Sequence, residues 1–120
     1  MFMRILLMAA LLAGAGGSPA VAQEFRAVTD ESEFRELTAG RELRRFGIRL
    51  EVLPQGDIVG RGFGYQVTGD WQWGESFFCR EMAYGSNAIS HNCQLVAING
   101  DTIRFISDRG EGEHADFRLR

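Results

Sequence analysis

The 120-residue chain contains no lysine, only two cysteines and two histidines, and no long apolar run. Its longest apolar stretch, residues 5–13, is well short of the ~20 residues that cross a bilayer as a helix. There is no basic run and a slight excess of acidic residues, which argues against nucleic acid or an anionic membrane surface as the partner. Neither histidine has a second ligand at the spacing of a zinc site, so the sequence predicts no metal and no cofactor.

The first 22 residues have the order of a secretory signal peptide. Arg4 lies near the start, the short apolar stretch follows, and small residues end in the sequence AVA at 20–22. Cleavage is expected before Gln23, which leaves residues 23–120 as a single small domain. We therefore expect a periplasmic or secreted protein with no membrane span after cleavage. The mature part has twelve arginines against sixteen acidic residues, a net charge near −4.

Cys79 and Cys93 are an even pair in a chain expected to be exported. This predicts one disulfide rather than a metal site or a redox centre. A disulfide that closes a loop of this length contributes ~3 kcal/mol to stability on the loop-entropy model. The sequence His91-Asn92-Cys93 contains the residue types of a thiol protease, but the disulfide would remove the thiolate that such catalysis needs.

A dinucleotide-binding loop is missing as well. In the run GRGFG at residues 60–64, the third glycine comes two residues after the second instead of three, and no helix follows. These glycines, together with Gly69, instead indicate strong bending, a bulge or close approach of another backbone within a strand. Such features are typical of a small, tightly curved sheet or barrel.

The remaining pattern predicts one helix followed by strands. The helix is expected at residues 31–38, with Asp30 and Glu33 as a capping box and Gly40 in a left-handed cap. From residue 43 the apolar period becomes alternating, which indicates strands with one buried face. The predicted fold is mainly β, a small antiparallel barrel or strongly curved sheet of about seven strands with one N-terminal helix against it.

Turn signals divide the predicted strands. Residues 54–57, PQGD, and the pair Asn99-Gly100 each predict a hairpin. Between them, apolar residues occupy odd positions from Val59 to Trp73, a loop is expected at 84–87, and the next strand is expected to begin near Asn92.

The aromatic residues give the candidate binding site. Trp71 and Trp73 share one face of their strand, so they form core if that face points inward. If it points outward beside Tyr65, it becomes an aromatic platform for a sugar or a flat ligand. Arg80 should lie on the face opposite to Cys79, where it could meet an anion. With Tyr84 added, the candidate ligand-binding residues are Tyr65, Trp71, Trp73, Arg80 and Tyr84.

In the stretches GDWQWGESFFCR and HNCQLVAINGDTIRF the chain resembles short exported proteins of alphaproteobacteria with a W-x-W, F-C-R, N-C-Q pattern. The resemblance covers most of the mature chain, and the pattern has no assigned chemistry. Members are sometimes labelled dihydrodipicolinate reductase, a label that this sequence does not support because it lacks the length and the dinucleotide fingerprint of those enzymes. The cysteines after a tryptophan-rich strand are also similar to those of calycin-like barrels of the cell envelope.

Three functions are compatible with this sequence. The first is a non-catalytic envelope protein that binds a small ligand or another protein through the open end of the sheet. The second is a hydrolase-like enzyme that uses His91 or His114 with a loop carboxylate. The third is an inhibitor that inserts a protruding loop, such as residues 84–92, into a partner enzyme.

Overall fold

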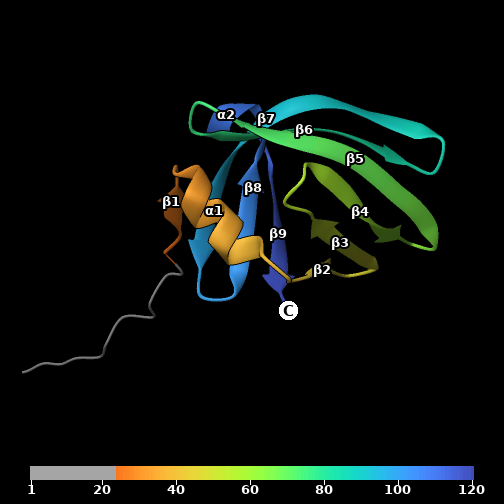
Figure 1. Ribbon diagram of the computed structural model, residues 1–120, viewed down its shortest axis with the longest axis horizontal. Helices are drawn as coiled ribbons and strands as arrows, with labels where there is room; N and C mark the ends of the chain where they lie inside the picture. Colours follow the sequence, from red (N-terminus) through yellow and green to blue (C-terminus); the bar gives the residue numbers. More distant parts are fainter. Residues whose placement is uncertain (1–23) are drawn as a thin grey trace, which may run out of the picture.

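The computed structural model describes residues 24–120, so the predicted signal peptide, residues 1–22, lies outside the described residues. Figure 1 shows antiparallel strands wrapped around a common interior. No helix in this part of the chain is long and apolar enough to cross a bilayer. The elements are β1 (Arg26–Val28), α1 (Glu31–Thr38), β2 (Leu43–Arg45), β3 (Ile48–Val52), β4 (Asp57–Gly62), β5 (Tyr65–Gly74), β6 (Phe77–Tyr84), β7 (Asn87–Asn99), β8 (Thr102–Ile106), α2 (Ser107–Gly110) and β9 (His114–Leu119).

Strands β2 to β9 form a closed antiparallel barrel. Each of them pairs with the next along the chain, and the pairing of β2 with β9 closes the ring. The long strand β7 pairs with β6 over residues 87–94 and with β8 over residues 95–99. The additional strand β1 pairs with the second part of β7. The predicted mainly β barrel is therefore confirmed, although two short strands, β1 and β2, were not recognised from the sequence.

The apolar alternation from Val59 to Trp73 does not belong to one strand face. A two-residue turn at Phe63-Gly64 separates β4 from β5, and both residues have positive φ, 49° and 87°. This combination fits the tight turns of right-twisted hairpins. The turn shifts the alternation, so that Val59 is 37% exposed whereas Val67 is buried.

Strand β7 begins earlier than expected. The predicted loop at 84–87 is a tight turn at Gly85-Ser86, and pairing with β6 starts at Asn87 rather than near Asn92. The segment from Ala88 to His91 is exposed along its length, so it lacks the buried alternation that identifies a strand in sequence. The turn at Asn99-Gly100 is where the sequence predicted it.

Glycines in the wall of the barrel allow close backbone contact. A Cβ atom on Gly60 would overlap the carbonyl oxygen of Arg49 on β3, and one on Gly69 would overlap the carbonyl oxygen of Glu81 on β6. Larger residues would push these strands apart. The glycines thus have the role that the sequence indicated, close approach within a curved sheet.

Helix α1 inserts Phe34 into the interior of the barrel, where this side chain is fully buried. The predicted capping box is not formed. The N-cap residue Asp30 makes no side-chain cap hydrogen bond, and its carboxylate accepts a bond from the Ser32 hydroxyl instead. Glu33 pairs with Arg26 of β1 at 2.6 Å, which ties the helix to the extra strand. Gly40 has the left-handed φ, 67°, that was expected after the helix.

Candidate functional site

Trp71 and Trp73 belong to an aromatic core rather than to an exposed platform. Trp71 is buried, Trp73 is partly buried, and the Phe34 ring lies 5.5 Å and 5.1 Å from their rings. The indole N–H of Trp71 donates to the carbonyl oxygen of Leu53 at 2.8 Å, so its one polar atom is satisfied. The same cluster continues through Phe78, 5.1 Å from the Phe34 ring. These contacts stabilise the barrel and leave no flat surface for a ligand.

Tyr65 and Tyr84 lie together but apart from the tryptophans. Their ring centroids are 5.3 Å apart, and Tyr65 is 59% exposed. Tyr84 packs over Gly62, whose missing side chain makes room for the ring. The five predicted ligand-binding residues therefore do not form one site, because the structure divides them among the core, this tyrosine pair and Arg80.

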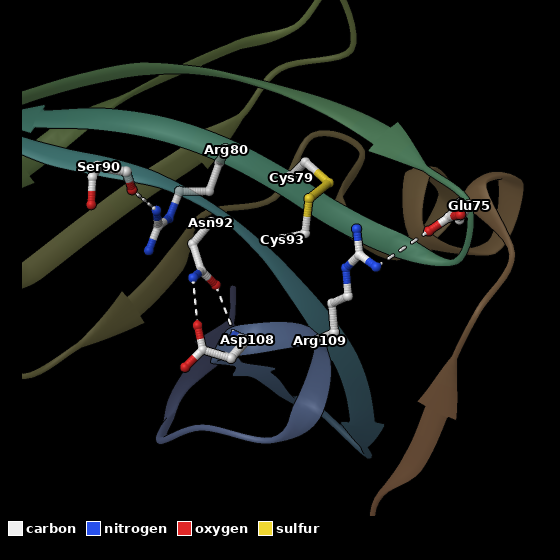
Figure 2. The surroundings of a disulfide bond; sticks show 8 residues. All are labelled: Glu75, Cys79, Arg80, Ser90, Asn92, Cys93, Asp108 and Arg109. Carbon is white, nitrogen blue, oxygen red and sulfur yellow. Dashed lines mark hydrogen bonds and ion pairs between the residues drawn. A yellow bond between two sulfur atoms is a disulfide. The ribbon is translucent and has the colours of Figure 1, made fainter.

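The predicted disulfide is present, and Figure 2 shows its surroundings. Cys79 of β6 and Cys93 of β7 lie directly opposite each other in the antiparallel register. The short segment α2 is held against this hairpin, because the Asn92 amide donates to the Asp108 carboxylate at 2.9 Å and accepts from the Asp108 backbone N–H at 3.0 Å. The bridge thus fixes the part of the wall to which α2 is attached.

His91 lies beside the disulfide. One ring nitrogen of this exposed residue and the sulfurs of Cys79 and Cys93 all fall within 4.8 Å of one another. Metal binding would need thiolates, and here the two sulfurs are joined to each other. Within residues 24–120, no hydrogen bond joins His91 or His114 to a carboxylate, so neither has the geometry of an oriented general base.

A cavity of about 180 Å³ lies inside the barrel. Ten of its twelve lining residues are apolar, and they come from seven strands, β2, β3, β4, β6, β7, β8 and β9. The two polar lining residues are Arg80 and Gln94. A mostly apolar cavity with a few convergent polar groups is the usual form of a small-molecule site.

Arg80 is held in place by an irregularity in the wall. Between Arg80 and Met82 the register with β7 shifts, because Arg80 lies opposite Asn92 and Met82 lies opposite Ile89. The chain advances by two residues on β6 and by three residues on β7 between these two pairs, so β7 has one extra residue. This is the geometry of a β-bulge. The carbonyl oxygen of Ser90, inside this bulge, accepts a 2.7 Å hydrogen bond from the Arg80 guanidinium (Figure 2). Bulges of this kind often re-aim a side chain at a functional site.

The charge of Arg80 is not balanced by a carboxylate. None of the ion pairs within residues 24–120 includes Arg80. Burial lowers the pKa of its guanidinium from the usual value, as expected for a cation that has lost water without gaining an anionic partner. A guanidinium stays protonated at physiological pH, so the cavity wall carries one positive charge.

Gln94 is the second polar group of the cavity and was not identified from the sequence. Its side chain is only 8% exposed, and its amide nitrogen makes one long hydrogen bond, 3.4 Å, to the Ser107 hydroxyl. Gln94 lies opposite Phe78 of β6. Phe78 is two residues before Arg80, so the two side chains lie on the same face of β6. Alternation along β6 and β7 could have placed both side chains inside, but only with the register of the hairpin known.

The cavity, rather than the tryptophan face, is therefore the candidate functional site. It combines an apolar body, one unpaired cation and one buried amide. Comparison with protein-family models, with curated proteins and with solved structures finds no match, so no relative assigns a role to these residues.

Proposed function

We propose that this protein binds a small amphipathic anion inside its barrel, with the anionic group on Arg80 and the apolar part in the cavity. The observation that carries the proposal is the position of Arg80 in the wall of an apolar cavity, where its half-buried guanidinium has no carboxylate partner among residues 24–120. An arginine in this setting favours a carboxylate ligand, because its planar fork matches the two carboxylate oxygens. Gln94 offers amide atoms for a further hydrogen bond.

The volume limits the part of the ligand that the barrel can enclose. A cavity of ~150 Å³ is large enough for benzene, and this cavity measures about 180 Å³. The ligand class is therefore a monocarboxylate with an aromatic ring or a short aliphatic chain.

The disulfide supports a location outside the reducing cytosol. Together with the signal-peptide pattern at residues 1–22, it supports an exported protein of the periplasm or the extracellular medium. Its role there is that of a binding protein. Within residues 24–120, neither histidine forms a hydrogen bond with a carboxylate, which favours the binding role over the hydrolase alternative.

Calorimetric titration with paired ligands tests the proposal. Benzoate and hexanoate are compared with benzyl alcohol and hexanol, which keep the apolar part and lack the charge. We expect the acids to bind about 10- to 100-fold more tightly than the alcohols, the range for a hydrogen bond to a charged group. The Arg80→Gln variant should lose this preference, whereas Arg109→Gln, which removes an exposed charge outside the cavity, should keep it.

A second variant tests the cavity itself. Ala115→Leu places extra methyl groups in the cavity lining without changing the charge. It should abolish binding of both acids while circular dichroism shows the wild-type fold. Equal affinity for the acids and the alcohols would refute the proposal. So would unchanged binding by both Arg80→Gln and Ala115→Leu.

A further inference from the structure

Four arginines from four neighbouring strands form one row on the outside of the barrel. In the antiparallel register, Arg118 of β9 lies opposite Arg44 of β2. Arg44 in turn lies opposite Arg49 of β3, and Arg49 lies opposite Arg61 of β4. All four are exposed, and their strands follow one another around the lower right of the barrel in Figure 1. Like charges directly opposite on adjacent strands destabilise a sheet, so the row has an energetic cost.

Nearby carboxylates neutralise this row only in part, although Glu42 and Glu51 line the same surface hollow as Arg49 and Arg61. Arg44 pairs with Glu42 at 2.6 Å. Within residues 24–120, the other three make no ion pair, and Arg61 donates to the carbonyl oxygen of Gly64 instead. The whole chain is acidic, with a net charge of −3, so this row is a local exception to its charge. An external anion is the partner that would offset the repulsion.

Two exposed phenylalanines project from the same end of the barrel. Phe46 lies in the turn between β2 and β3 and is 90% exposed; Phe63 lies in the turn between β4 and β5 and is 57% exposed. Their ring centroids are 6.2 Å apart. The Phe63 ring lies against Gly47, and its backbone N–H donates to the Gly47 carbonyl oxygen at 2.8 Å. The two turns thus form one apolar tip.

The backbone of Phe63 is a second unusual feature of this tip. Its φ is 49°, a left-handed conformation that bulky residues rarely adopt. Such a conformation has an energetic cost, and it occurs preferentially at functional sites. A glycine would adopt this turn conformation more easily than phenylalanine, so the exposed ring comes at a cost in backbone energy.

From these observations we infer that the arginine row and the Phe46–Phe63 tip form a docking face for an anionic lipid bilayer. The row precedes the tip by two residues on both β2 and β4, a distance of ~7 Å along a strand. Apolar groups of peripheral proteins enter the interface by ~5–10 Å, so the arginines would then lie at the level of the lipid phosphates. This face is separate from the cavity, and the inference goes beyond the proposed ligand binding.

The arrangement favours a bilayer over a soluble polyanion. Single-stranded nucleic acid binds where aromatic rings lie among the basic residues and bases stack on them. Here both rings project beyond the row, at the turns, where they would reach an apolar layer. Charge complementarity and the apolar tip thus point to the same occupant.

Vesicle co-sedimentation tests the inference on the mature chain, residues 23–120, because the apolar stretch at residues 5–13 would itself bind vesicles of either composition. The vesicles are phosphatidylcholine alone or phosphatidylcholine with about a third phosphatidylglycerol, an anionic surface of the kind that attracts basic residues. We expect binding to the anionic vesicles only, and weaker binding as salt is raised. The double variant Arg49→Gln/Arg61→Gln should bind about 25-fold more weakly, since each arginine near such a surface contributes about fivefold.

A matched control removes the same number of charges elsewhere. The double variant Arg26→Gln/Arg109→Gln changes residues outside the row and should retain wild-type binding.

Phe46→Ser should bind about tenfold more weakly without lowering the melting temperature, since Phe46 is already exposed. Arg80→Gln should bind vesicles normally, which separates this inference from the cavity. Equal loss in the two double variants, binding to neutral vesicles, or tighter binding to heparin or single-stranded DNA than to vesicles would overturn it.

Discussion

Replacement of Phe34 by alanine should reveal how much the barrel depends on the side chain that α1 inserts. Phe34 is fully buried and its ring contacts those of Trp71, Trp73, Phe78 and Phe105. Truncation of a buried phenylalanine to alanine costs about 3–5 kcal/mol, because apolar contacts are lost and a cavity remains. A domain of this size has only about 5–15 kcal/mol of stability. The variant should therefore lose between about a fifth and all of the wild-type stability.

Urea denaturation followed by tryptophan fluorescence measures this loss, because both tryptophans lie beside the altered site. The midpoint should fall while the slope of free energy against urea is unchanged. In thermal melts the same loss corresponds to a decrease of about 15–30 °C. Glu36→Ala, on the exposed side of the same helix, is the control and should change stability by less than about 0.5 kcal/mol. A loss below about 1 kcal/mol for Phe34→Ala would show that the helix does not support the core.

Three further outcomes can be measured on the same protein. Reduction of the Cys79–Cys93 disulfide should remove about 3 kcal/mol, and coincident melts with and without reductant would contradict that value. The hydrogen bond from Arg104 holds the pKa of the Asp116 carboxyl below its usual value, so this carboxylate stabilises the fold above the unfolded pKa and loses its effect as pH falls through the folded pKa. Asp116→Asn should thus be less stable than wild type at neutral pH and equal to it in acid, and a constant difference across this range would be inconsistent with the pairing. Arg49→Gln should raise stability by about 0.2–1 kcal/mol at low salt and by less at high salt, because it removes repulsion between opposite strands; a decrease would argue against the arginine row.

The sequence predicts this fold best where the signals are local. The alternation around Leu50 and the pair Asn99-Gly100 give a strand and a turn correctly, because each depends only on neighbouring residues. The turn at Phe63 was missed because a phenylalanine with positive φ has no turn signature. The start of β7 at Asn87 was missed because its first residues are exposed and include a bulge.

The candidate sites show the same limit. Arg80 was identified as a residue that could meet an anion, but its cavity combines seven strands and no single stretch of sequence contains it. The arginine row could not be predicted from the sequence, because Arg44 and Arg118 are far apart in the chain and meet only when β2 pairs with β9. Sequence alone argued against an anionic surface because it contains no basic run. Register, which depends on the whole closed barrel, brings the charges together.

The pairing of β2 with β9 has a consequence for the order of folding. From β2 to β9, each strand can form a hairpin with the next soon after it is made, whereas this contact joins residues near 43 to residues near 119. Contacts between distant residues carry a larger loop-closure cost and generally form late. We expect the seam to be the last part of the ring to form and the first to exchange its amide hydrogens, and Arg44 and Arg118 repel each other across it. An anion that bridges these two residues would stabilise the pairing of β2 with β9. Binding of an anionic partner would then be coupled to closure of the barrel.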